Sequence, residues 1–216
     1  MENNKSILIV GAGPGIAMGI AQKFGKEGYA VGLISRNENK LAKLTQELSE
    51  QGITSKFATA DAGNPEELAT AIQSLRNELP TIETVHYNAA VLRPLNVLDN
   101  DPKELLNDLN VGIVGAVTTI QAVRNDLKEN KGTFLLTGGG FADYPMAAYG
   151  SVSLAKAGIK NLTKQLHNEL KAEGIYVGSV SVNGMVSSTD SKYNPNSIGD
   201  VFFELKSSRT EPFYNY

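Results

Sequence analysis

The glycine-rich segment over residues 11–19 constrains the possible folds more than any other part of this sequence. It follows residues 6–10, a continuous apolar run of the kind expected for a strand that is buried on both faces. It reads Gly-Ala-Gly-Pro-Gly-Ile-Ala-Met-Gly and leads into a helical pattern that continues to Phe24. A strand, a glycine turn and a helix in this order are typical of the first unit of a dinucleotide-binding α/β sheet.

Strands and helices alternate along the rest of the chain. The apolar patterns predict further strands over residues 29–35, 55–59, 81–87, 133–137 and 175–182, with a possible edge strand at 213–216. They predict helices over residues 37–50, from Pro65 onward, over 102–128 and 150–173, and near 197–206. Such alternation favours right-handed βαβ units and a parallel sheet with helices on both faces. We therefore predict a single Rossmann-type, doubly wound α/β domain over residues 1–216 that binds NAD(P).

Charge and composition argue against several other classes of protein. The net charge is -3, and Lys and Arg are scattered, whereas a nucleic-acid site needs a basic stripe. No apolar run approaches the ~20 residues that cross a bilayer, and no signal peptide is visible. We therefore expect a cytoplasmic protein with a small-molecule substrate and with neither a nucleic-acid nor a membrane partner. There is no cysteine, and no metal site is predicted.

The glycine loop has the features that a pyrophosphate site requires. Phosphate oxygens need backbone N–H donors, the positive end of a helix dipole and close approach of the main chain. Glycines at 11, 13 and 15 lack the Cβ atoms that would block this approach. The predicted contacts of this loop are Gly11, Gly13, Pro14, Gly15 and Ile16.

The end of the second strand predicts which dinucleotide binds. An acidic residue about 20 positions after the loop accepts a hydrogen bond from the ribose 2′-hydroxyl of NAD. Ser35-Arg36-Asn37 stands there instead, and it contains no carboxylate. Arg36 can pair with a 2′-phosphate while Ser35 donates to it, so we predict NADP, with NAD as the less favoured alternative.

With these motifs, the chain resembles the short-chain dehydrogenase/reductase (SDR) family nearly from end to end. Residues 10–17 look like the family's Thr-Gly-x-x-x-Gly-x-Gly loop, with the first Thr and the last Gly replaced. Asn88-Ala89-Ala90 is similar to the Asn-Ala-Gly segment that supports the fourth strand and the cofactor. The resemblance implies a seven-stranded sheet and a homodimer or homotetramer.

Other positions that match the family take their expected roles from the resemblance. Asp61 lies where the family holds the adenine, and Asn110 matches an asparagine that organises a proton-relay water. The segment over residues 183–188 stands in for Pro-Gly-x-Val-x-Thr, which contacts nicotinamide and phosphates in the family. The contacts implied for this segment are Asn183, Gly184, Val186 and Ser188.

The chain departs from the family at its catalytic motif, Tyr-x-x-x-Lys. A lysine one turn from a tyrosine stabilises the phenolate and lowers the phenol pKa, so the tyrosine can exchange protons near neutral pH. Lys156 is present, but Val152 stands four residues before it, and Gly139 aligns best with the family's carbonyl-binding serine. In the family this lysine also binds the nicotinamide ribose, which gives Lys156 a role in binding the cofactor.

Three residues are candidates to replace the missing groups. Tyr149 is seven residues before Lys156, two turns along the same helix face, and a nonhelical start could bend its ring back. Tyr144 lies on the loop after the three glycines at 138–140, and Thr137 could supply a hydrogen bond to the substrate carbonyl.

Two main functions follow from these features. One is an NADP-dependent oxidoreductase that acts on a small carbonyl or alcohol with a rearranged proton donor. The alternative is a non-catalytic NADP(H)-binding redox sensor or complex subunit. An isomerase or lyase is a third possibility, because the fold alone does not establish the chemistry.

Overall fold

The predicted apolar runs form one parallel sheet of seven strands in the order β3-β2-β1-β4-β5-β6-β7. In the computed structural model, which describes residues 4–216, every paired strand runs parallel to its neighbour. The first three residues of the predicted domain lie outside the described residues. The strands are β1 (Lys5–Val10), β2 (Ala30–Ser35), β3 (Ser55–Thr59), β4 (Thr81–Tyr87), β5 (Thr133–Thr137), β6 (Tyr176–Ser181) and β7 (Phe213–Asn215). The predicted doubly wound Rossmann architecture is therefore confirmed.

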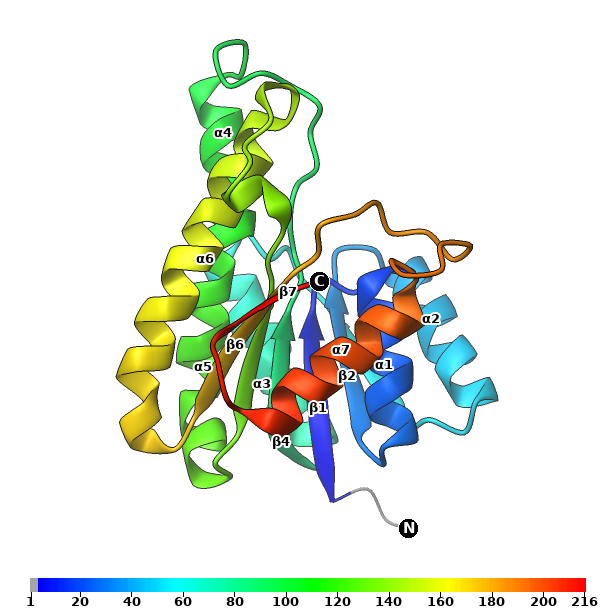
Figure 1. The fold of residues 1–216 in the computed structure, drawn as a ribbon. Helices are drawn as coiled ribbons and strands as arrows, with labels where there is room; N and C mark the ends of the chain where they lie inside the picture. Colours follow the sequence, from blue (N-terminus) through cyan, green and yellow to red (C-terminus); the bar gives the residue numbers. More distant parts are fainter. Residues whose placement is uncertain (1–3) are drawn as a thin grey trace.

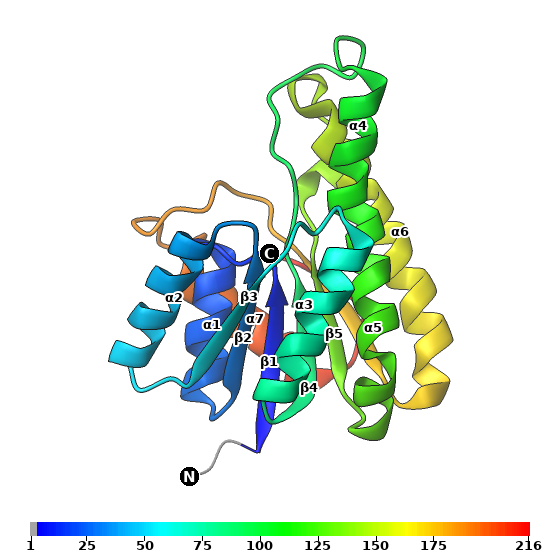
Figure 2. The ribbon, with the colours of Figure 1, turned by 180° about the vertical axis from the view of Figure 1, so that it is seen from behind.

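Helices cover both faces of the sheet (Figures 1 and 2). On one face, α1 (Ile16–Lys26), α2 (Glu38–Glu50) and α7 (Pro195–Ser208) bury residues such as Phe24, Leu44 and Phe202. On the other face lie α3 (Pro65–Glu78), α5 (Gly115–Glu129) and α6 (Gly150–Leu170). Within residues 4–216, no helix combines the length and apolar character needed to span a membrane.

Helix α1 is held against α7 by direct backbone contact. A Cβ atom on Gly19 would lie 1.8 Å from the carbonyl oxygen of Pro195, and one on Gly199 would lie 2.4 Å from the carbonyl oxygen of Gly19. Only glycine fits such a crossing. The contact fixes the helix whose N-terminus follows the glycine loop.

The helix predicted over residues 102–128 is instead two α-helices joined by a π-helical turn. Helix α4 (Pro102–Leu109) is followed by the turn over Asn110–Val114 and then by α5. In a regular helix the amide of Gly115 would donate to the carbonyl of Val111. Here the Tyr87 hydroxyl donates to that carbonyl, and the Gly115 amide donates to the carbonyl of Asn110 instead. The hydroxyl of a neighbouring strand thus accounts for a local change that helical periodicity does not encode.

Candidate functional site

The glycine loop connects β1 to α1 at the carboxyl edge of the sheet, and its first glycine is required by the fold itself. Gly11 has φ +87°, and a Cβ atom there would lie 2.4 Å from the amide nitrogen of Ala89. The amides of Gly11 and Ala12 both donate to the carbonyl of Ile34, each at 2.9 Å. The loop is therefore fastened to the ends of β2 and β4.

The next two glycines are not required by packing. Neither Gly13 nor Gly15 has a positive φ, and an added Cβ atom at either position would meet no protein atom within 4 Å. The N-terminus of α1 has no side-chain cap, and its first turn contains no acidic residue. Open space above the loop and an uncompensated positive helix end are the features that suit a bound phosphate.

Six predicted cofactor residues line one cavity of about 250 Å³ next to this loop. They lie within two residues of the carboxyl ends of β1, β2, β3 and β4, although they are far apart in the sequence. Val111 of the π-helical turn also lines this cavity. The six are Gly11, Ser35, Arg36, Asp61, Asn88 and Ala89.

The charged side chains at the mouth of this cavity are loosely paired. Arg36 lies 3.9 Å from Asp61, and 72% of its side-chain surface is exposed. Asp61 accepts a hydrogen bond from the amide of Gly63 at 2.8 Å, which fixes its carboxylate. Asn37 caps α2 through the Lys40 amide, so Ser35 and Arg36 are the polar residues left at the end of β2. An exposed, weakly paired arginine can turn toward an added phosphate at little cost.

A chain of buried and partly buried hydrogen bonds links the glycine loop to the carboxyl ends of β4 and β5. Asn88 Nδ2 donates to the Gly11 carbonyl at 3.0 Å, and the Thr137 hydroxyl donates to Asn88 Oδ1 at 2.9 Å. Because a hydroxyl has one hydrogen, Thr137 can only accept from His86 Nε2, which lies 2.8 Å away. The network therefore assigns His86 to the Nε2–H tautomer. In this arrangement Thr137 has no hydrogen left for a substrate carbonyl.

His86 itself is fully buried against Phe202. Its Nδ1 has no hydrogen-bond partner among the described residues. Burial, assisted by the nearby charge of Lys156, lowers the pKa of His86 to about 3. The ring is therefore neutral at physiological pH and is suited to supporting the loop rather than to acid–base chemistry.

Lys156 reaches from α6 to the carboxyl end of β5, where Nζ donates to the Thr137 carbonyl at 2.6 Å. Its aliphatic stem passes Gly139, and a Cβ atom on Gly139 would lie 3.7 Å from it, an ordinary contact. Burial lowers the pKa of Lys156 to about 8. Val152, at the tyrosine position of the family motif, is only 3% exposed and carries no ionisable group.

The two candidate tyrosines occupy different environments. Tyr149 is the N-cap of α6 and has nonhelical backbone angles, so its side chain is not fixed by the helix geometry. Its ring stacks on Phe141, with centroids 5.7 Å apart, two residues beyond Gly139. Tyr144 is 81% exposed on the loop between these residues. Of the two, Tyr149 is the one held beside the glycine triplet over residues 138–140.

The remaining predicted residues lie outside the cavity of about 250 Å³. Asn110 begins the π-helical turn next to Val111, and its carbonyl accepts from the Gly115 amide. Residues 183–188 belong to the loop between β6 and α7 that projects above the sheet in Figure 1. Pro14 and Ile16 lie on the glycine loop and at the start of α1, and Asn183, Gly184, Val186 and Ser188 lie on the β6–α7 loop.

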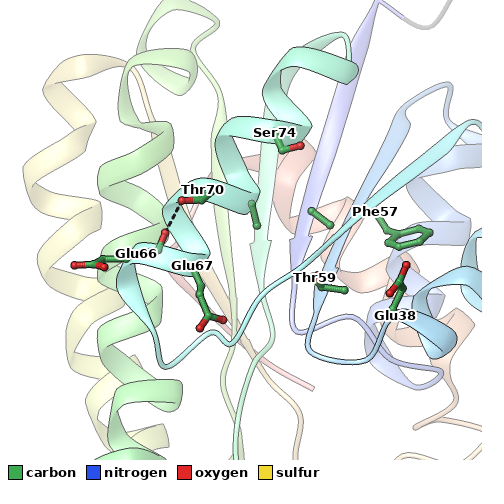
Figure 3. A pocket seen from close by; sticks show the side chains of 9 residues that line it. Glu38, Phe57, Thr59, Glu66, Glu67, Thr70 and Ser74 are labelled. Atoms are coloured by element: carbon green, nitrogen blue, oxygen red, sulfur yellow. Dashed lines mark hydrogen bonds between the residues drawn. The ribbon is translucent and has the colours of Figure 1, made fainter.

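A larger hollow of about 600 Å³ lies at the β3 edge of the sheet, between α2 and α3 (Figure 3). Three carboxylates line it, from Glu38, Glu66 and Glu67, and its lining contains no basic residue. Such a surface repels phosphate, so size alone does not identify the cofactor site. Within residues 4–216, no group of three His, Asp or Glu side chains is placed to hold a metal ion.

Some lining residues are not identified by the sequence motifs. Val111 enters the cavity because of the π-helical turn, which has no sequence signature of its own. Lys160, which forms an ion pair with Asp143 beside Lys156, lines a different cavity. The spacing of four residues between Lys156 and Lys160 could have indicated that both lie on one helix face.

The comparisons with known proteins point to one family. The model of the short chain dehydrogenase family matches residues 5–197. An uncharacterized oxidoreductase of Staphylococcus aureus strain MW2 is 26% identical over 193 residues, which are 89% of this chain and 83% of the relative. A diacetyl reductase [(S)-acetoin forming] of Staphylococcus epidermidis is 24% identical over 178 residues, which are 82% of this chain and 69% of the relative.

Solved structures share the fold. An alcohol dehydrogenase from the archaeon Thermococcus sibiricus, complexed with 5-hydroxy-NADP, superimposes with a TM-score of 0.86 at 19% identity. The match covers 98% of this chain and 95% of that one. A metagenomic short-chain oxidoreductase in complex with NADP gives a TM-score of 0.87 at 19% identity, over 99% of this chain and 95% of that one.

Proposed function

Because the chain belongs to the short chain dehydrogenase family, we propose that it is an NADP(H)-dependent oxidoreductase that interconverts a small carbonyl compound and its alcohol. The observation that carries this proposal is the glycine loop with its uncapped helix. Gly13 lacks a side chain where the protein has open space, and the bare N-terminus of α1 lies beside it. A bound pyrophosphate explains both features.

The proposal assigns each part of the dinucleotide to residues that suit it. Gly13, Gly15 and Ile16 would bind the pyrophosphate, and Asp61 would lie at the adenine. Arg36 and Ser35 would bind the 2′-phosphate, because an exposed guanidinium and a hydroxyl suit a dianionic group. Two structural neighbours were determined with NADP or a hydroxylated NADP, which supports NADP as the cofactor. When bound, the reduced cofactor supplies the hydride.

We further propose that Tyr149 donates the proton in place of the missing tyrosine at position 152. Its ring lies against Phe141, beside the turn that follows Gly139. The ammonium group of Lys156 would hold the nicotinamide ribose and favour the phenolate by its charge. Asn110 would hold a relay water, as the resemblance implies. Tyr144 is the alternative donor.

The test is a screen of aldehydes, ketones, quinones and small diketones for oxidation of NADPH. Diketones belong in the screen because one relative is named as a diacetyl reductase. We expect turnover that falls at least about ten-fold in Tyr149→Phe and in Lys156→Ala, a loss of the order seen when a positioned general acid is removed. Unchanged turnover in Tyr149→Phe, Tyr144→Phe and Lys156→Ala would refute the proposed proton donors.

The second candidate function is non-catalytic binding of NADP(H) by a redox sensor or complex subunit. It is favoured by Gly139 and the buried Val152, which leave the two positions of the family's chemistry without hydroxyl groups. NADPH would then bind at micromolar concentration without turnover, and a partner protein would co-purify. Robust turnover of any carbonyl compound would exclude this function. The cytoplasmic location and the homodimer or homotetramer stay predictions from the sequence.

A further inference from the structure

A second polar cavity, of about 240 Å³, lies between α6 and the carboxyl ends of β5, β6 and β7. Gly138 and Gly139 form one wall, Lys156 and Lys160 another, and Phe213–Asn215 of the last strand a third. The cavity shares no lining residue with the cavity next to the glycine loop. It is smaller than the ~300–1,000 Å³ typical of sites for drug-sized ligands, so its ligand must be small.

The charges in this cavity do not balance. Lys160 pairs with Asp143, and both line the cavity. Lys156 has no carboxylate partner within residues 4–216, and burial alone accounts for its lowered pKa. Two ammonium groups and one carboxylate leave an excess of one positive charge. The protein as a whole has a net charge of -3, so this excess is a local feature.

The unpaired ammonium also has unused donors. Lys156 Nζ donates one hydrogen to the Thr137 carbonyl at 2.6 Å, and an ammonium group has three. With one of the other two given to the nicotinamide ribose, as proposed above, one remains for an anion. Ser179 and Asn215 add neutral polar groups to the walls. Burying a charge without a partner is costly, and an anion that enters the cavity would remove this cost.

We propose that this cavity binds the carboxylate of a short monocarboxylic acid through Lys156 and Lys160, and that the substrate of the enzyme is therefore a small oxo acid. The carbonyl group would lie at Gly139, the position that matches the family's carbonyl-binding serine, with the carboxylate directed into the cavity. A single negative charge matches the excess of one positive charge. The assignment of the acid as substrate rests on the proposed function, whereas the binding site itself does not.

The test is calorimetric titration of the full chain, without dinucleotide, using pyruvate and its uncharged analogue pyruvamide at low ionic strength. We expect pyruvate to bind at least about ten-fold more tightly than pyruvamide. Lys156→Met should weaken pyruvate binding at least about ten-fold, and Lys160→Met should weaken it less, because Lys160 already has a partner. Lys164→Met is the matched control, since Lys164 lies exposed on the same helix outside the cavity.

A second variant probes the cavity without changing its charge. Gly139 has extended backbone angles, so Gly139→Val can fold, and its side chain would enter the space beside Lys156. It should abolish pyruvate binding while the thermal unfolding midpoint is kept. Equal binding of pyruvate and pyruvamide, or unchanged binding in Lys156→Met, would overturn the proposal, as would no binding at about 10 mM pyruvate.

The outcomes separate this site from the proposed function. If pyruvate binds as expected but no carbonyl compound is turned over, the carboxylate site stands and the oxidoreductase function fails. If neutral carbonyl compounds are reduced but pyruvate does not bind, the oxidoreductase function stands and the carboxylate site is refuted.

Discussion

Protonation of the buried His86 should make this protein less stable in mild acid, by an amount that follows from its environment. The ring is completely buried between the sheet and Phe202, and its Nδ1 has no partner among the described residues. Burial and the charge of Lys156 lower its pKa from 6.5 to about 3. The unfolded chain therefore binds a proton between about pH 6.5 and pH 3 that the folded protein does not bind.

The direction in which pH changes the stability follows from this difference in proton binding. The stability due to neutral His86 is fully present above pH 6.5 and is lost as the pH falls toward about 3. Each pH unit within this window costs about 1.4 kcal/mol, so the loss between pH 7.5 and pH 5 is about 2 kcal/mol. A loss of this size is a substantial part of the ~5–15 kcal/mol that stabilises a typical domain.

The assay is urea unfolding at pH 7.5 and at pH 5 for the wild type and for His86→Gln. Glutamine keeps a donor for Thr137 but does not titrate, and other ionisable groups contribute equally to both proteins. Between the two pH values the wild type should lose about 2 kcal/mol more free energy of unfolding than His86→Gln. His167→Gln is the control, because His167 is only half-buried and its Nδ1 donates a hydrogen bond to the Val177 carbonyl of β6 at 2.9 Å. Equal losses in wild type and His86→Gln would refute the reasoning.

Four further substitutions test the cofactor loop, the phosphate site and the glycine triplet. Gly13→Ala should change the free energy of unfolding by no more than about 0.5 kcal/mol. It should weaken NADPH binding at least about ten-fold in fluorescence titrations. Gly11→Ala should instead lower the free energy of unfolding by about 2 kcal/mol or more, because Gly11 has a positive φ and contacts Ala89. If Gly13→Ala binds NADPH normally, the pyrophosphate is not at this loop. Arg36→Asp should weaken NADPH binding by about ten-fold or more and NADH binding much less, and equal weakening of both would contradict the 2′-phosphate site. Gly139→Ser should keep the thermal midpoint, since its Cβ atom meets only an ordinary contact at 3.7 Å, and should raise carbonyl turnover about ten-fold or more by restoring a hydrogen-bond donor. A marked loss of stability in Gly139→Ser, or turnover equal to that of the wild type, would contradict this interpretation.

The architecture could be predicted from the sequence, because the information for it is local. The apolar run before Gly11 and the helical spacing of Leu41, Leu44 and Leu48 each report whether a segment is buried on both faces or on one. Alternation of such segments leaves few topologies, and the observed sheet is parallel, as expected, with the seven strands that the family resemblance implies. Val152 and Gly139 were equally visible as departures from the family motif.

The contacts between side chains that are distant in the sequence could not be predicted in this way. His86 and Thr137 are 51 residues apart, yet their hydrogen bond fixes both the tautomer of the ring and the orientation of Asn88. The Tyr87 hydroxyl accounts for the π-helical turn at Asn110, and the ion pair of Asp143 with Lys160 leaves Lys156 as the unpaired charge of its cavity. The periodicity of apolar residues indicates which face of a helix or strand is buried. These contacts depend instead on the distances between helices and strands after packing, and a local sequence pattern does not contain those distances.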